Sequence, residues 1–308
     1  MLGLVWLSDR KKLNSLSGRE RPPFGIVRRI LHISLPITSG RYLNTALRTA
    51  ENILVPKNLA KYPHSGELAL SQFGMIKGMA LPILFFPSTL LNSISTLLIP
   101  EMSEAAAKGR TGLVSSATRN ILKLTAVMSF IFGAIFFAGG KEIGLLIYKS
   151  EDVGSLLRAL SPIVPLMYLD SVSDGILKGL DQQAFSFRTA ITDSTLRIIL
   201  ILIFLPVSGL RGFILIMYFS NFLTCALNVG RLMRVSKARL KPINEVLLPL
   251  AAAFCITLLA DTLLRLIPDI NNLVYLILIC LISLPLYLLF ISLIGTVTVD
   301  DVKDFIKR

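Results

Sequence analysis

The fold class is decided by runs such as residues 273–294, LVYLILICLISLPLYLLFISLI, which carry no charged side chain. A helix needs about 20 predominantly apolar residues to cross the hydrocarbon core of a bilayer, so this run is long enough for one span. Inside hydrocarbon every backbone N–H and C=O must be satisfied within the segment, which favours a helix over a strand of an open sheet. The run therefore predicts a transmembrane helix.

Seven further runs of near-span length precede it. They are residues 30–56, 72–98, 120–140, 160–179, 190–207, 212–229 and 246–267. The whole chain is 53% hydrophobic and only 17% charged, whereas about a quarter of the residues of soluble domains are charged. The gaps between runs are too short for a soluble domain. The sequence thus predicts an all-α integral membrane protein with about eight transmembrane helices.

The basic residues indicate how these helices cross the membrane. Beside the loops, 20 Lys and Arg residues fall on one side and seven on the other. Because cytoplasmic loops carry the excess of Lys and Arg, both termini are predicted to be cytoplasmic, in a multi-pass protein of the cytoplasmic membrane. The net charge of +13 does not indicate a nucleic-acid partner, since the basic residues lie between apolar runs. The connection 99–119 is rich in helix formers and predicts a short interfacial helix.

Charged side chains stand where they are energetically costly in the first run. Arg41, Asn44, Arg48 and Glu51 are spaced i, i+3, i+7 and i+10, which places them on one helical stripe. A charge at the centre of a transmembrane helix costs about 2.5–3.5 kcal/mol on insertion scales, so each needs a partner or a watery cavity. We interpret the stripe as a groove for an anionic head group, with Glu51 orienting Arg48 or taking a coupling cation. The alternative is a set of structural ion pairs against a partner lobe.

The second run adds polar residues to a kinked helix. Lys77 and Asn92 fall on one face if the helix is straight, but Pro82 and Pro87 each remove a backbone hydrogen bond and bend it. A bent polar helix fits a gate, and it fits a bent core helix equally well. The predicted substrate-binding residues are Arg41, Asn44, Arg48, Lys77 and Asn92.

Acidic residues recur in the fourth and fifth runs. Asp170, Asp174 and Lys178 are spaced at intervals of four, and Asp193 and Arg197 form an acid-then-base pair at i and i+4. Such pairs contribute only a few tenths of a kcal/mol on an exposed helix, so stability alone does not account for them. Asp170 lies deepest in its run and is a candidate proton or cation site. The predicted ion-coupling residues are Glu51, Asp170 and Asp174.

Motifs for covalent chemistry are missing from the sequence. There is no HExxH, no GxSxG and no Gly-rich phosphate loop that leads into a helix. The three cysteines fall in separate apolar runs without CxxC spacing, which is typical of small core residues. The sequence therefore predicts a transporter and not an enzyme, with no catalytic residue, no metal and no cofactor.

Three segments carry a family resemblance. They are GMALPILFFPSTLLNSISTLLIPEMSEAAA (78–107), LDSVSDGILKGLDQQAFSFRTAITDSTLRIILILIFLP (169–206) and GLRGFILIMYFSNFLTCALNVGRLM (209–233). They resemble the polysaccharide-flippase branch of the multidrug/oligosaccharidyl-lipid/polysaccharide (MOP) exporter superfamily, in particular the stage V sporulation protein B-like proteins. That family implies fourteen helices, in two six-helix lobes plus a final pair, around a central cavity that opens alternately to either side.

By this resemblance the chain corresponds to the C-terminal lobe, helices seven to twelve, and the final two helices. Its implied parts are a cytoplasmic basic segment with the remnant of a preceding helix (1–29), a six-helix transporter lobe (30–235), and the final helix pair with a cytoplasmic tail (236–308). We expect either a truncated product or a separately encoded N-terminal lobe as partner, because alternating access needs two bodies.

The implied function is to move an anionic, lipid-linked saccharide across the cytoplasmic membrane, among membrane lipids, for cell-wall, spore-cortex or polysaccharide assembly. Related lipid II flippases have an arginine and a glutamate before the FP of the second run, where this sequence has Pro82 and Phe85. Arg41, Arg48 and Lys77 are therefore the cations expected to bind phosphate here. The alternatives are a cation-coupled multidrug exporter and an inactive fragment or assembly partner. A pyrophosphate requires several cations in the cavity, which favours the flippase.

Overall fold

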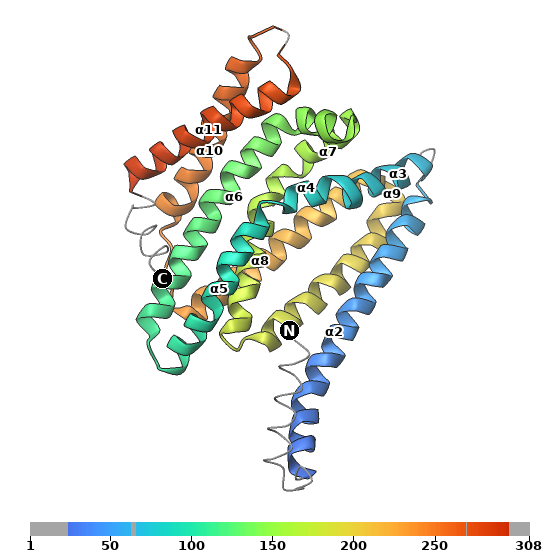
Figure 1. Cartoon of the computed structure of the whole chain (residues 1–308). Helices are drawn as coiled ribbons and strands as arrows, with labels where there is room; N and C mark the ends of the chain where they lie inside the picture. Colours follow the sequence, from blue (N-terminus) through green and yellow to red (C-terminus); the bar gives the residue numbers. More distant parts are fainter. Residues whose placement is uncertain (1–23, 63–65, 269, 296–308) are drawn as a thin grey trace, which may run out of the picture. The chain divides into compact units, whose positions relative to one another are not determined.

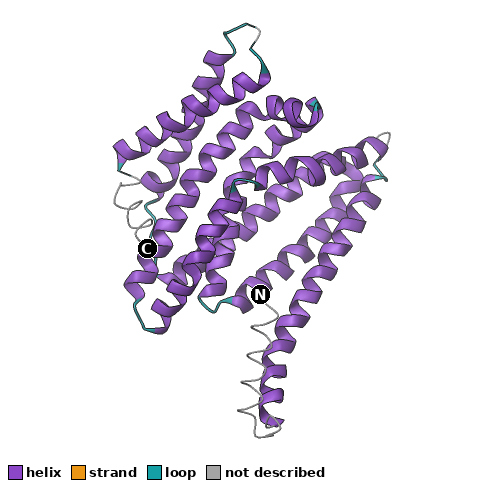
Figure 2. Cartoon of the chain, viewed as in Figure 1, coloured by secondary structure: helices purple, strands orange, loops and turns teal. Residues whose placement is uncertain are grey.

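The computed structural model describes residues 24–62, 66–268 and 270–295, and within these ranges it consists of helices joined by short loops, with no strand (Figure 2). The first helix, α2 (Phe24–Leu59), runs through the boundary between two compact units, Met1–Ala46 and Leu47–Arg308. In the first unit the described residues, 24–46, form the first part of α2.

The second unit contains the end of α2 and all later helices. They are α3 (Gly66–Met75), the π-helix η1 (Ile76–Ala80), α4 (Leu81–Phe85), α5 (Ser88–Ala107), α6 (Thr111–Tyr148), α7 (Glu151–Leu160), the 3₁₀ turn η2 (Ser161–Ile163), α8 (Val164–Gly179), α9 (Gln183–Ser236), the π-helix η3 (Ile243–Leu247), α10 (Leu248–Leu264) and α11 (Asn272–Ile294). The long helix α6 is central: α5, α7, α8, α10 and α11 all pack against it (Figure 1).

The surface and the lengths of the helices fit a bilayer. Large apolar side chains remain exposed along α10 and α11, among them Leu259, Leu281 and Leu293, as expected of helices that face lipid. In the described part of the chain, five helical stretches are long and apolar enough to cross a membrane. They are Glu67–Phe85, Thr111–Tyr148, Gln183–Ser236, Ile243–Arg265 and Asn272–Ile294. The predicted fold class, an all-α membrane protein, is confirmed, and the count of about eight spans is approximate.

Helix α9 covers two of the predicted runs and folds back between them. Gly209 has φ 55° and ψ −140°, a backbone conformation outside the helical region that glycine adopts without a Cβ penalty. A straight helix would place Asp193 and Ser220 about 40 Å apart, yet the Ser220 hydroxyl donates a hydrogen bond to Asp193. The two halves of α9 therefore lie side by side as an antiparallel pair, which agrees with the separate runs 190–207 and 212–229.

The expected interfacial helix at 99–119 is wrong. Helix α5 continues to Ala107 and α6 already begins at Thr111, so the connection shrinks to a turn at 108–110. The helix formers that suggested a separate element extend the two flanking helices instead. Helix α6 likewise continues to Tyr148, past the expected end of the third run at residue 140.

The final helix pair is held along α6 by apolar packing and by ion pairs. Small residues of α10, Ala252 and Ala253, and Tyr287 of α11 form a buried cluster with α6. Arg119 near the start of α6 donates to the buried Glu245 of η3. The division of the chain at residues 30 and 236 stays a prediction, and residues 1–23 and 296–308 of its outer parts lie outside the described residues.

Candidate functional site

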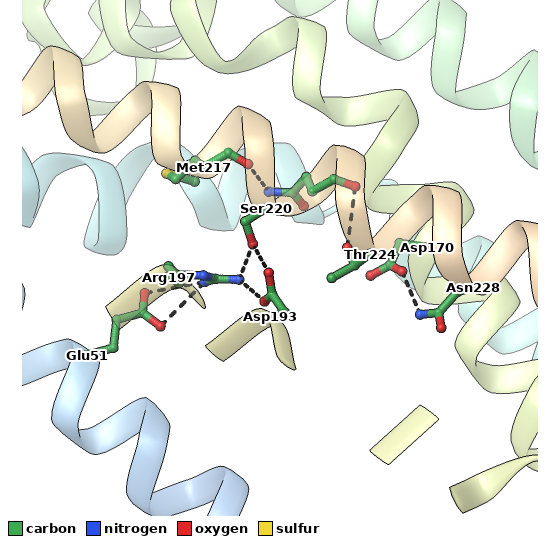
Figure 3. A network of polar contacts seen from close by, with 9 residues as sticks. Glu51, Asp170, Asp193, Arg197, Met217, Ser220, Thr224 and Asn228 are labelled. Atoms are coloured by element: carbon green, nitrogen blue, oxygen red, sulfur yellow. Dashed lines mark hydrogen bonds and ion pairs between the residues drawn. The ribbon is translucent and has the colours of Figure 1, made fainter. Parts of the chain in front are cut away.

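The side chain of Arg197 lies at the centre of a polar network (Figure 3). Its Nη1 donates to the two carboxylate oxygens of Glu51 at 3.3 and 3.5 Å. Its Nη2 donates to Asp193 Oδ2 at 2.5 Å and to Ser220 Oγ at 2.6 Å. Ser220 in turn donates to the other oxygen of Asp193. One guanidinium thus connects two carboxylates and a hydroxyl.

These four residues come from three helical segments. Glu51 lies on the part of α2 that belongs to the second unit, Asp193 and Arg197 lie one turn apart on the first half of α9, and Ser220 lies on its second half. Asp193 and Arg197 meet through helical spacing alone, whereas Ser220 reaches them because α9 folds back at Gly209. The network therefore ties the start of the second unit to both halves of α9.

The network is withdrawn from the surface of the second unit. Glu51, Asp193 and Ser220 are all buried, and the side chain of Arg197 is 26% exposed. A buried charge carries a large desolvation cost unless it is paired and hydrogen-bonded. The forked guanidinium meets that requirement for both carboxylates at once, because its donors point in fixed, divergent directions.

Lys77 of η1 extends this group of charges towards the surface. Its Nζ donates to Asn52 Oδ1 at 3.1 Å and lies 5.8 Å from the ring centre of Phe73. It also interacts electrostatically with Glu51, Arg197 and Arg48. Lys77 is exposed, so its charge is accessible beside the buried network.

A second polar group lies where α5, α8 and the second half of α9 meet. Asp170 Oδ1 accepts a hydrogen bond from Asn228 Nδ2 at 2.8 Å. The neighbouring Ser171 donates to Asn92 Oδ1 at 3.0 Å. The predicted substrate-binding residue Asn92 of α5 thus contacts Ser171, which follows the predicted ion-coupling residue Asp170 on α8.

The remaining predicted residues lie apart from these two groups or outside the description. Asp174 forms an ion pair with Lys178 at 2.5 Å, one turn further along α8. Arg48 is exposed on α2, and Asn44 is half-buried in the first unit. The side chain of Arg41 lies outside the described residues. The binding and coupling roles given to all these residues stay predictions.

Sequence reasoning missed Ser220 of the network and Asn228, the partner of Asp170. A signal was present: Ser220, Thr224 and Asn228 recur every four residues in the mostly apolar run 212–229, which places them on one helical face. The partner of Glu51 was also missed, because Arg197 lies 146 residues away in sequence.

An apolar cavity of about 380 Å³ lies between α6, α8, the second half of α9 and η3. Leu122, Phe222 and Val229 line it, and Lys123 and Glu245 supply its charged groups. Such a lining suits a hydrocarbon chain better than a sugar, because a buried hydroxyl without a partner is costly.

The side chains of the network form ion pairs with one another, and their arrangement favours this over binding a metal ion. In the ranges that the structure describes, no three His, Cys, Asp or Glu side chains come together in a way that could hold a metal ion. Two carboxylates do converge, and the guanidinium of Arg197 lies between them. The arrangement can hold two carboxylates in their charged form inside a membrane.

Apolar helical spans around buried ion pairs define the chain as a multi-pass helical membrane protein. Its curated relatives are sporulation proteins of Bacillus subtilis (strain 168). The chain is 23% identical over 185 residues to Stage V sporulation protein B, a match that covers 59% of this chain and 36% of that protein. It is 26% identical over 135 residues to Sporulation protein YkvU, covering 44% of this chain and 30% of that protein. The chain is thus homologous to the stage V sporulation protein B-like proteins, as its motifs predicted.

A solved structure shares the fold. The lipid II flippase MurJ in an inward closed conformation aligns with a TM-score of 0.59 and 18% sequence identity, over 89% of this chain and 56% of that chain. No family model matches the chain. The matches span about a third of the length of the curated relatives and just over half of the flippase chain. A large part of each of these proteins therefore lies outside its match to this chain.

Proposed function

We propose that the chain forms part of a flippase that moves an anionic, lipid-linked saccharide across the cytoplasmic membrane, in cell-wall, spore or polysaccharide assembly. The observation that carries the proposal is the shared fold with a lipid II flippase over 89% of the chain. Homology to two sporulation proteins supports a role in the envelope of a sporulating cell.

In this proposal the exposed cations receive the phosphate groups. Arg48 and Lys77 interact electrostatically within one neighbourhood, and Arg and Lys are the side chains that bind phosphate most strongly. Arg41, Asn44 and Asn92 complete the proposed substrate-binding set. The cavity beside α6 offers an apolar environment for the hydrocarbon part of the lipid.

The rest of the transport path would come from protein beyond these 308 residues, either a longer product or a separate N-terminal lobe. Alternating access requires two bodies that move about a shared site, and the match to the flippase covers 56% of its chain. Both termini of this chain are proposed to lie in the cytoplasm. A multidrug exporter fits less well, because cationic drugs would need unpaired carboxylates and Glu51 and Asp193 are paired with Arg197.

The test is reconstitution of the full chain with a matching N-terminal half in vesicles that contain fluorescent lipid II. Flipping is measured as the fraction of probe that an impermeant quencher reaches over time. We expect Arg48→Ala to slow flipping by roughly tenfold or more, the equivalent of one lost charge-assisted hydrogen bond to phosphate.

Arg110→Ala is the matched control, since Arg110 is an exposed arginine in the turn before α6. It should insert and flip as the unsubstituted chain does. Unchanged flipping in Arg48→Ala would refute the role of Arg48. If vesicles with the unsubstituted chain and its N-terminal half move lipid II no faster than empty vesicles do, the flippase proposal itself is refuted.

A further inference from the structure

Two carboxylates and one hydroxyl converge on a single point of the second unit, an arrangement with the oxygen ligands of a small cation site. Glu51, Asp193 and Ser220 supply the oxygens, from three helical segments (Figure 3). The position that a cation would take is filled by the guanidinium of Arg197. We infer that Arg197 is the resident cation of this site, so that the protein binds no sodium or other metal ion there.

The charges of the surroundings balance without an added ion. Glu51, Asp193, Asp170 and Asp174 are the carboxylates within electrostatic range of one another or of Arg197. The cations of the same neighbourhood are Arg197, Lys77 and Arg48, together with Lys178, which pairs with Asp174. Four negative and four positive side chains leave no net charge to attract a metal cation from solution. A metal ion at Glu51 would also have to displace a guanidinium that Asp193 and Ser220 hold at 2.5 and 2.6 Å.

The two arms of the guanidinium differ in strength. The contacts to Glu51 on α2 are 3.3 and 3.5 Å, whereas those to Asp193 and Ser220 on α9 are 2.5 and 2.6 Å. Charge-assisted hydrogen bonds weaken beyond about 3 Å. Arg197 therefore stays with α9, and the bond to Glu51 is the one that opens if α2 moves against α9.

The assignment of Arg197 as the resident cation rests on the contacts of its guanidinium. Only the consequence for transport rests on the proposed function. Glu51 was a candidate for taking a coupling ion, and the structure replaces that ion with a side chain of the same protein. In a flippase, α2 would separate from α9 when the ion pair between Glu51 and Arg197 opens. No sodium gradient would act at this site.

The first experiment removes the resident cation. The full chain with Arg197→Ala is purified in detergent, and its melting temperature is measured with sodium, choline or methylguanidinium chloride at equal ionic strength. We expect the unsubstituted protein to melt at the same temperature in sodium and choline. The Arg197→Ala variant should melt lower, and millimolar methylguanidinium should recover much of the loss by entering the site.

Arg231→Ala is the matched control. Arg231 donates two hydrogen bonds to the neutral Gln182, so its removal leaves no carboxylate behind. Methylguanidinium should not raise the melting temperature of this variant. Equal recovery in both variants, or no recovery in a folded Arg197→Ala variant, would overturn the inference.

A second measurement applies if Arg197→Ala does not fold. Binding of radioactive sodium to the unsubstituted protein is compared with binding to Glu51→Gln and Asp193→Asn. We expect no saturable sodium binding that depends on either carboxylate, and a smaller fall in melting temperature for Glu51→Gln than for Asp193→Asn. Sodium binding that disappears in Glu51→Gln would overturn the inference, whether or not the protein proves to be a flippase.

Discussion

Single side chains hold the helices together where proline breaks them. Between α4 and α5 the regular hydrogen bonding is interrupted at Phe86–Pro87, because proline has no N–H to donate. At this break the phenol of Tyr168 on α8 donates to the carbonyl of Leu84 at 2.6 Å, and both residues are buried. One hydroxyl thus satisfies a carbonyl inside the protein and joins two helices.

Tyr168→Phe should therefore destabilise the protein by about 1–2 kcal/mol, since it leaves a buried carbonyl without its donor. The measurement is the melting temperature of the purified protein in detergent. Tyr218→Phe is the control: Tyr218 donates in the same way to the carbonyl of Ala159 at 2.7 Å, but Tyr218 is only half-buried and Ala159 is exposed, so its loss should cost less. Equal losses in the two variants would contradict this role of burial.

Helices α6 and α7 approach each other closely enough that their backbones touch. A Cβ atom placed on Gly144 of α6 would lie 2.6 Å from the Cα of Gly154 on α7 and 2.7 Å from the carbonyl oxygen of Ser150. The neighbours are backbone atoms, which cannot rotate away. Small residues commonly allow such packing between membrane helices, and here they fix α7 against the end of the central helix.

Gly144→Ala should destabilise the protein by about 1–3 kcal/mol through overpacking. Gly175→Ala is the contrasting variant, because a Cβ at that position in α8 meets nothing within 4 Å. An alanine there should be neutral or stabilising by up to about 1 kcal/mol, as usual for a helix interior. Thermal unfolding of the two variants side by side tests the difference, and a destabilised Gly175→Ala with an unaffected Gly144→Ala would refute it.

In the second unit, the two ends of α6 lie beside loops that are predicted to be on opposite sides of the membrane. It has 38 residues and is about 57 Å long, more than the thickness of a bilayer. Ser115 near its start donates to the carbonyl of Lys237 at 3.2 Å, whereas Lys149 follows its last residue. Lys237 and Lys149 therefore mark the two ends of α6. The distribution of basic residues predicts that Lys237 lies on the cytoplasmic side.

Single cysteines at these two positions test the orientation. In a chain without Cys225, Cys255 and Cys280, Lys149→Cys should react with an impermeant maleimide added to intact cells. Lys237→Cys should react only after the membrane is opened. The reverse pattern would show that the basic loops face outwards, and labelling of both positions from outside would contradict a spanning α6.

Much of the architecture followed from local sequence. Apolar runs, proline positions and helical spacing predicted the helical membrane fold and the pair Asp193–Arg197, because neighbours on one helix are set by the 3.6-residue period. The interfacial helix at 99–119 was wrong because the same helix formers can extend a neighbouring helix. The resemblance of the chain to stage V sporulation protein B-like proteins was confirmed by homology.

The sequence by itself therefore determined that this is a membrane protein and which segments form its apolar helices. Both depend on the length and apolarity of continuous segments. Only the tertiary structure decided the partners of the charged groups. Glu51 meets Arg197 across 146 positions, and Ser220 meets Asp193 across the fold at Gly209. The physical reason is that a buried charge is stabilised by whichever opposite charge the packing of helices brings within hydrogen-bond distance, and that distance has no counterpart in spacing along the chain.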